Sequence, residues 1–208
     1  IGTSIGIAIA PDHGTDQEQL LKKADLALYR SKSSGRNCFT IYDKAMSAEL
    51  EARSTLEGDL RDAIARCQLE VHYQPFVDAL SGTRRGFEAL VRWRHPTRGL
   101  IAPDQFIPLA EETGLIVPLG SWVLDEACAR GAELQATHGR NMKMSVNVSA
   151  RQFQHPDFVS HLERALDESA LPPECLMLEL TESVLVTSGS AIEQALARLK
   201  DIGVTLAL

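Results

Sequence analysis

The chain has 208 residues, of which 44% are hydrophobic and 24% are charged. These fractions are close to those of folded soluble proteins, so they exclude wholesale disorder and collagen-like repetition. The formal net charge of −7 argues against a DNA or RNA polymer as partner, because gripping its backbone needs clustered positive charge. No apolar run approaches the roughly 20 residues that span a bilayer.

The four cysteines lie far apart and form neither a C-x-x-C pair nor any zinc-ligand spacing. They are Cys38, Cys67, Cys128 and Cys175. We interpret them as reduced, mostly buried thiols of a cytoplasmic segment. A membrane anchor elsewhere in a longer protein stays open.

Residues 1–66 are expected to form a small strand–helix–strand unit followed by a charged helix. Apolar residues at 5–9 predict a strand, 15–31 a helix, 38–42 a second strand, and 44–66 a mostly helical linker. The apolar runs at the two ends of the chain indicate strands cut from a longer protein. Gly58 and a change in composition place the boundary between two units near residues 44–60.

From residue 68 onward, strands and helices alternate. Strands at 69–77 and 85–93 are joined by a short turn at 78–82, so they must be antiparallel neighbours. The other expected elements are helices at 103–112, at 121–137 with Ser121 as its cap, at 156–168 and at 188–200, and strands at 142–148, 176–181 and from 204. This alternation predicts an α/β fold with a parallel sheet, about half of a closed α/β barrel. An open Rossmann sheet competes, but no G-x-G-x-x-G motif opens any of these helices.

Polar residues interrupt three of the apolar strands. Glu88, Asn147 and Glu179 each have apolar neighbours on both sides, and Glu182 follows the last of them closely. In a parallel α/β barrel, such groups meet at the carboxyl ends of the strands. Carboxylates in an apolar setting need a cation, and oxygen ligands favour a hard divalent ion. Alternatively, each glutamate faces solvent or forms an ordinary ion pair.

Two further positions have two readings each. Arg92 lies either beside Glu88 as a phosphate clamp or, with Arg94, on an ordinary exposed edge. Gln74 is either a ligand contact or a buried structural amide. The six histidines show no pairing typical of catalysis, and we expect them at the surface.

Four motifs in order make the second part of the chain recognisable. They are Tyr-Gln-Pro at 73–75, Glu-Ala-Leu-Val-Arg-Trp at 88–93, Asn-Val-Ser at 147–149 and Glu-Leu-Thr-Glu at 179–182. Residues 56–208 resemble the first half of an EAL domain. The motifs at 4–6, 24–29 and 32–37 resemble the tail of a GGDEF domain. The whole chain thus resembles the junction of a bacterial tandem GGDEF-EAL protein.

This resemblance implies a GGDEF tail at 1–43, a helical linker at 44–60, and at 61–208 the first part of an EAL-type TIM-like barrel, which is incomplete. It implies hydrolysis of cyclic di-GMP to linear pGpG in bacterial second-messenger signalling, with two divalent ions, Mg²⁺ or Mn²⁺. It also implies an upstream GGDEF domain and a sensory domain as partners, and it allows a homodimer of the longer protein.

Residue roles follow from the same resemblance. Glu88, Asn147 and Glu179 match metal ligands, with Glu88 as the central catalytic residue, and Gln74 and Arg92 match substrate contacts. Glu182 matches a residue that supports the loop holding the second metal. Lys32 and Arg36 match phosphate contacts of the GGDEF family, or they simply complement the dipole of a solvated helix end.

The family's paired Asp-Asp, and a Lys and a Glu that follow it, are expected beyond Leu208. We therefore expect the chain by itself to be inactive and the longer protein to be a cyclic di-GMP phosphodiesterase. The alternative is a degenerate EAL domain that binds cyclic di-GMP as a sensor without hydrolysing it.

Overall fold

The computed structural model describes residues 2–66, 68–138, 142–181, 184 and 190–207. The chain divides into two compact units, Ile1–Gly58 and Asp59–Leu208. Helix α2 (Lys44–Ala65) begins in the first unit and ends in the second, and the expected linker at 44–60 lies within it. Among the described helices, none combines the length and apolar character that crossing a bilayer requires.

The first unit is a helix packed on a two-stranded parallel sheet. Strands β1 (Ile5–Ile7) and β2 (Phe39–Ile41) pair in parallel, and helix α1 (Gln17–Ser33) connects them. Asp16 starts the helix because its carboxylate accepts the N–H of Gln19 at 3.0 Å. Gly6 permits the close packing, since a Cβ there would fall 2.1 Å from the carbonyl oxygen of Ala24.

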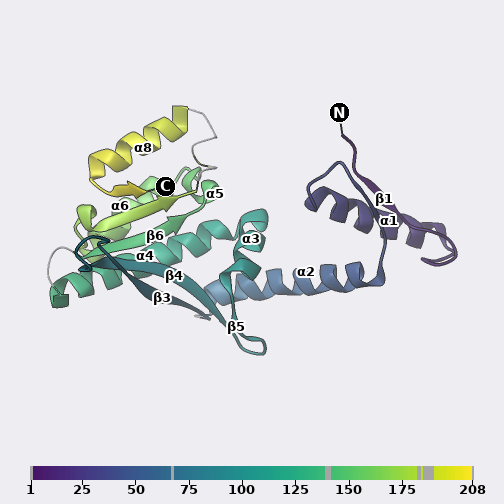
Figure 1. Ribbon diagram of the computed structural model, residues 1–208, viewed down its shortest axis with the longest axis horizontal. Helices are drawn as coiled ribbons and strands as arrows, with labels where there is room; N and C mark the ends of the chain where they lie inside the picture. The colour runs from purple at the N-terminus through teal and green to yellow at the C-terminus, as the bar shows by residue number, and fades with distance from the viewer. Residues whose placement is uncertain (1, 67, 139–141, 182–183, 185–189, 208) are drawn as a thin grey trace. The chain divides into compact units, whose positions relative to one another are not determined.

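The second unit is built on a six-stranded sheet with the order β3-β4-β6-β7-β8, and β5 pairs with β4 outside this path (Figure 1). The strands are β3 (Leu69–Val77), β4 (Arg84–His95), β5 (Gly99–Ile101), β6 (Lys143–Val148), β7 (Leu176–Leu180) and β8 (Thr205–Ala207). The β3–β4 and β4–β5 pairs are antiparallel, and the remaining pairs are parallel. The expected α/β fold with a parallel sheet is confirmed.

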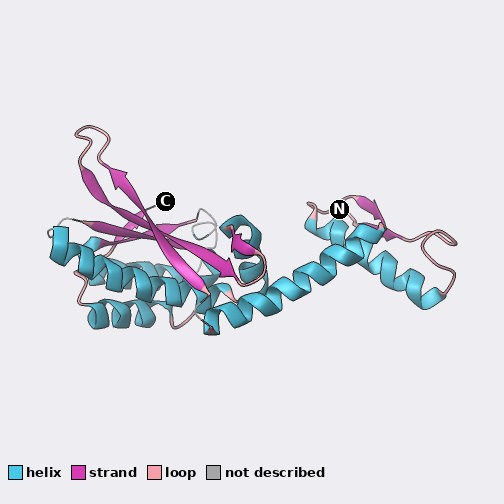
Figure 2. Cartoon of the chain, turned by 90° about the horizontal axis from the view of Figure 1, so that it is seen from below, coloured by secondary structure: helices cyan, strands magenta, loops and turns pink. Residues whose placement is uncertain are grey.

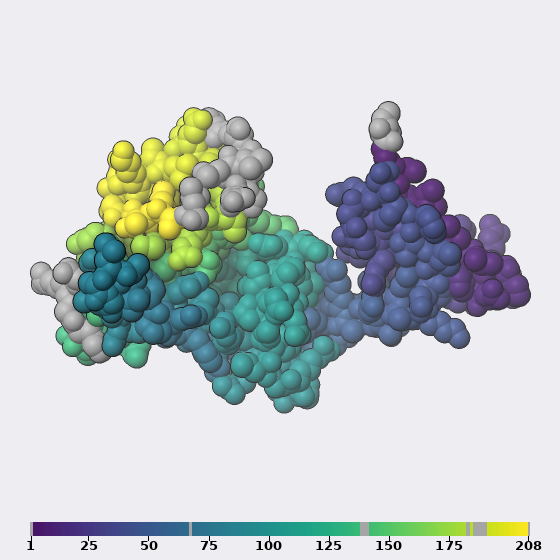
Figure 3. All heavy atoms as spheres, in the orientation of Figure 1, coloured from purple at the N-terminus to yellow at the C-terminus, as the bar shows by residue number. Residues whose placement is uncertain are grey.

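Helices cover one face of this sheet (Figure 2). They are α3 (Pro103–Thr113), α4 (Ile116–His138), α5 (Ala150–Phe153), α6 (Phe158–Ser169) and α8 (Ser190–Ile202), with a 3₁₀ turn at Pro173–Cys175. Helix α8 packs on α6, and β8 pairs with β7 (yellow and light green in Figure 3).

Alternating side chains explain why the described helices cover only one face of the sheet. In β6, the apolar Met144, Val146 and Val148 are buried, whereas Asn147 between the last two is exposed. In a strand, successive side chains point to opposite faces, so the apolar set faces the helices. The polar set therefore occupies the opposite face of the sheet.

Three expectations need correction. Ser121 does not cap a helix, because α4 begins at Ile116, directly after Gly114 ends α3 in a left-handed conformation with φ 84°. The short elements β5 and α5 have no counterpart in the sequence-based prediction. His95 is buried rather than at the surface, since it packs beside Trp93 with their ring centroids 5.3 Å apart.

Two of the cysteines fit the expected buried thiols and one does not. Cys128 and Cys175 are buried, whereas Cys38 is exposed, and all three are free thiols. Cys67 lies outside the described residues. Burial, with a smaller contribution from Asp125, raises the pKa of the Cys128 thiol to about 12.

Candidate functional site

The site begins where β4 and β6 lie side by side on the uncovered face of the sheet. These strands pair from Gly86 opposite Lys143 to Ala89 opposite Val146. Beyond Ala89 they are no longer paired with each other, although β4 continues to His95. Residues near this end of both strands, among them Arg92 and Asn147, line a cavity that is described below.

Glu88, Asn147 and Glu179 come together on this face. The Asn147 side-chain amide donates a hydrogen bond to Glu88 Oε1 at 2.7 Å, and Asn147 lies opposite Glu179 in the β6–β7 register. Ser145 donates to Glu179 Oε1 at 2.5 Å. Glu88 and Glu179 are partly buried and Asn147 is exposed. Neither glutamate forms an ion pair with Lys, Arg or His within the described part of the chain, so the simple ion-pair reading does not fit.

The donor atoms suit a hard divalent cation, because all of those on offer are carboxylate or amide oxygens. Three such side chains on three adjacent strands supply part of a coordination shell. Within the described residues, no cluster of three or more His, Cys, Asp or Glu side chains forms a metal site.

Gln74 lies directly opposite Glu88 in the antiparallel β3–β4 register. Its side chain is exposed, so the reading of Gln74 as a buried structural amide is wrong. The preceding Tyr73 points to the other face and reaches the Glu126 carbonyl of α4 at 3.5 Å. Burial, and next the charge of Glu126, raise the pKa of Tyr73 to about 12, which keeps this phenol neutral.

Arg92 and Arg94 have separate roles. Arg94 forms an exposed ion pair with Glu70, with 2.9 Å between Nη2 and Oε1. Arg92 is partly buried, donates to the Val91 carbonyl at 2.9 Å, and lines a cavity. The exposed-edge reading therefore fits Arg94 alone.

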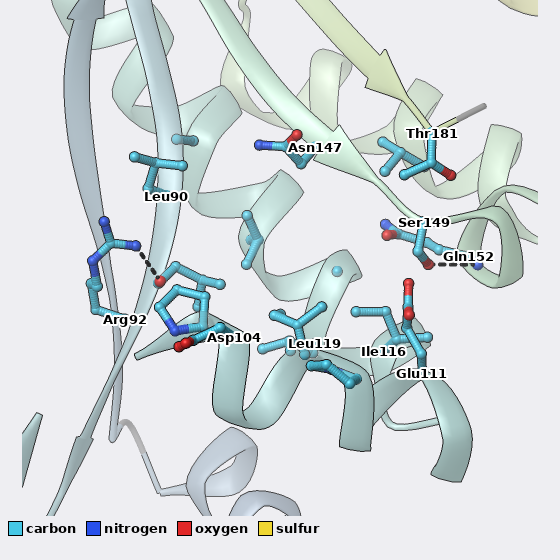
Figure 4. A pocket seen from close by; sticks show the side chains of 18 residues that line it. Leu90, Arg92, Asp104, Glu111, Ile116, Leu119, Asn147, Ser149, Gln152 and Thr181 are labelled. Atoms are coloured by element: carbon cyan, nitrogen blue, oxygen red, sulfur yellow. Dashed lines mark hydrogen bonds between the residues drawn. The ribbon is translucent and has the colours of Figure 1, made fainter. Parts of the chain in front are cut away.

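The cavity adjoins the polar cluster and has a volume of about 430 Å³. Its floor consists of apolar residues of α3 and α4, among them Ile107, Pro108, Ile116 and Leu119. Figure 4 shows Arg92 and Asp104 at one end, Glu111, Ser149 and Gln152 at the other, and Asn147 at the rim. An apolar floor with a few converging polar groups is typical of a small-molecule site.

The other residues singled out from the sequence lie elsewhere. Glu182 lies outside the described residues. In the first unit, Lys32 is exposed in the last turn of α1, and Arg36 is exposed in the following turn with φ 62°. Sequence reasoning missed Glu111 and Gln152, both of which line the cavity.

Comparison with protein-family models settles the family. The model described as "EAL domain" matches residues 57–208. This chain belongs to the EAL domain family. The model described as "Diguanylate cyclase, GGDEF domain" matches residues 1–38, so a GGDEF tail precedes the EAL domain.

Relatives with the same arrangement include proteins of bacterial signalling. The bifunctional diguanylate cyclase/cyclic di-GMP phosphodiesterase MucR of Pseudomonas aeruginosa is 44% identical over 209 residues, which covers 100% of this chain and 30% of that protein. An uncharacterized signaling protein of Caulobacter vibrioides is 43% identical over 208 residues, 25% of its length. The chain thus spans between a quarter and a third of these curated relatives.

Solved structures give the same result for the fold. The PaMucR phosphodiesterase in complex with c-di-GMP has a TM-score of 0.70 and 45% identity, covering 73% of this chain and 62% of that one. The EAL enzyme Bd1971, bound to cAMP and cyclic-di-GMP, has a TM-score of 0.72 and 29% identity, covering 92% of this chain and 50% of that one. The second unit is therefore a partial EAL barrel.

Proposed function

We propose that this EAL domain binds cyclic di-GMP and that the longer protein hydrolyses it to linear pGpG with divalent ions, Mg²⁺ or Mn²⁺. The observation that carries the proposal is the meeting of Glu88, Asn147 and Glu179 on the uncovered face of the sheet. The 45% identity to a phosphodiesterase whose structure holds c-di-GMP supports the choice of ligand.

In this proposal Glu88, Asn147 and Glu179 hold the cation, and Ser145 orients Glu179 through its 2.5 Å hydrogen bond. A bound divalent ion lowers the pKa of water and stabilises charge on a phosphoryl group in the transition state. Glu182 supports the metal-holding loop.

Arg92 and Gln74 contact the ligand on either side of Glu88. Arg92 supplies a fixed positive charge at the rim of the cavity, where a phosphate of the anionic dinucleotide would lie. Gln74, opposite Glu88, offers an amide that can donate to a phosphate or hydroxyl oxygen. In the first unit we assign phosphate contacts of the GGDEF domain to Lys32 and Arg36.

The test is Glu88→Gln in a protein that carries the complete EAL domain. The substitution keeps the shape of the side chain and removes its charge, so we expect the phosphodiesterase rate to fall about a hundredfold or more. The matched control is Glu133→Gln, which removes an exposed carboxylate of α4 paired with Arg130. Initial rates are measured against Mg²⁺ and Mn²⁺ concentration.

Three outcomes distinguish the readings. Loss of activity in Glu88→Gln but not in Glu133→Gln supports the metal role of Glu88. Near-full activity of Glu88→Gln at all metal concentrations contradicts it. Binding of cyclic di-GMP without any turnover by the unsubstituted protein favours the non-catalytic sensor.

A further inference from the structure

Ser145 lies two residues before Asn147 on β6, and its side chain is on the same face of the sheet. It is only 1% exposed. In the β4–β6 register Ser145 stands opposite Glu88, yet its hydroxyl donates to Glu179 Oε1 of β7 at 2.5 Å. One buried serine therefore stands beside the first glutamate and holds the second.

Asn147 shows the reverse arrangement. In the β6–β7 register it stands opposite Glu179, yet its side-chain amide donates to Glu88 Oε1 at 2.7 Å. Two alternate residues of β6 thus make crossed hydrogen bonds, each to the glutamate that it does not face in the register. The crossing holds one oxygen of each carboxylate toward the same strand.

Both donors are neutral, and this matters for a cation site. A guanidinium or ammonium donor would offset the charge of a carboxylate, whereas a hydroxyl and an amide leave that charge in place. Oε2 of Glu88 and Oε2 of Glu179 form no hydrogen bond or ion pair with any described residue. The two negative charges and one oxygen of each glutamate are therefore left for a bound ion.

The burial of Ser145 makes its hydrogen bond effective. Water does not compete for a hydroxyl that is 1% exposed, so Oε1 of Glu179 keeps its donor when no ion is bound. Residues that hold a ligand carboxylate without touching the metal typically contribute about 10- to 100-fold to metal affinity. Without such a donor, the side chain loses its rotamer freedom only when the ion binds, which weakens binding.

We propose that Ser145 is a positioning residue, which sets the carboxylate of Glu179 before a divalent ion binds and raises the affinity for that ion without contacting it. This inference rests on the proposed function, since it takes Glu179 to be a metal ligand. It adds a residue outside the motifs that carry the family resemblance, and it assigns that residue to metal affinity rather than to the chemical step.

The test is equilibrium binding of Mn²⁺ to a protein that carries the complete EAL domain, followed by the electron paramagnetic resonance signal of the free ion. Ser145→Ala should weaken binding about tenfold. Ser145→Cys fills the same space but is a weak donor, so it should weaken binding as well. The matched control is Ser31→Ala, which removes the hydroxyl of a fully buried serine that donates to the Ile5 carbonyl of the first unit. This control should leave the Mn²⁺ affinity unchanged.

A comparison of affinity with rate separates positioning from a general loss of structure. The phosphodiesterase rate of Ser145→Ala should fall at low Mn²⁺ concentration and approach that of the unsubstituted protein at saturating Mn²⁺, because the residue does not touch the reacting groups. A damaged fold would lower the rate at every Mn²⁺ concentration. A rate that stays low at saturating Mn²⁺ therefore contradicts the positioning role.

The remaining outcomes separate this inference from the proposed function. If Ser145→Ala and Ser145→Cys bind Mn²⁺ as tightly as the unsubstituted protein, while Glu88→Gln binds it more weakly, the positioning role is overturned and the proposed function stands. If Ser145→Ala weakens binding and Ser145→Cys does not, packing rather than the hydrogen bond is responsible, and the role is again overturned. If the unsubstituted protein binds no Mn²⁺, the metal role in the proposed function fails, and this inference fails with it.

Discussion

His95, the last residue of β4, forms a hydrogen bond with Asp59, the first residue of the second unit. Its Nε2 lies 3.1 Å from Asp59 Oδ2, and its Nδ1 accepts the backbone N–H groups of Thr97 and Arg98, each at 3.2 Å. Because Nδ1 accepts, the proton lies on Nε2, which donates to Asp59. We predict that His95→Ala strongly destabilises the second unit.

The magnitude follows from three losses. The hydrogen bonds to Asp59 and to the turn contribute about 1 kcal/mol each. The ring contact with Trp93, at 5.3 Å between centroids, adds about 0.5–1.5 kcal/mol. The Asp59 side chain is 37% exposed, so solvent screens its contribution and the lower part of the range applies. We expect His95→Ala to lower the free energy of unfolding by about 2–3 kcal/mol.

The assay is urea denaturation of the chain followed by tryptophan fluorescence. The two tryptophans, Trp93 and Trp122, both lie in the second unit, so the signal reports on that unit alone. The control is His72→Ala, since the His72 side chain is 51% exposed and pairs only with Glu70 among the described residues. We expect this control to change the free energy of unfolding by less than about 0.5 kcal/mol.

A loss below about 1 kcal/mol in His95→Ala would refute this reasoning. An equal loss in His95→Ala and His72→Ala would refute it as well, because the effect would then not depend on burial. Asp59→Asn, which retains an acceptor for Nε2, should cost no more than about 1 kcal/mol.

Three further predictions concern two glycine substitutions and the reactivity of the thiols. Gly86→Ala should destabilise the second unit by about 2 kcal/mol or more in thermal denaturation, because a Cβ there would lie 2.2 Å from the carbonyl oxygen of Lys143. By contrast, Gly58→Ala lies in open space within helix α2 and should stabilise it by about 0.5–1 kcal/mol. Brief treatment of the native protein with iodoacetamide at pH 8 should modify the exposed Cys38 and spare Cys128, whose thiol stays neutral with a pKa of about 12. Mass spectrometry checks this, and equal modification of both thiols would contradict it.

Local patterns were sufficient to predict the β3–β4 hairpin. Asp78 at the turn accepts the N–H groups of Leu80 and Ser81, at 3.2 and 2.9 Å, so the turn is encoded within four residues. The polar face of the sheet could also be predicted, because alternation along a strand places Asn147 on the face opposite to that of its apolar neighbours.

Features that depend on contacts between residues far apart in the chain could not be predicted from the sequence. His95 contacts Asp59 of helix α2, which lies 36 residues earlier in the chain, and this contact does not follow from the neighbours of His95 in sequence. Glu111 of α3 and Gln152 of α5 line one cavity although they lie 41 positions apart in the sequence, so only the packed fold brings them to it. The start of α4 was misplaced because Ser121 matches a cap in composition, whereas Gly114 ends the preceding helix earlier.

The end of the β4–β6 pairing at Ala89 has a consequence for how the cavity can change during evolution. The positions of the two strands are set by main-chain pairing, so replacing the side chains that line the cavity leaves the sheet beside it in place. A relative could therefore differ in the side chains that line this cavity and still keep the same sheet. The cavity can thus change its chemistry through side chains alone, without a change in how β4 and β6 pair.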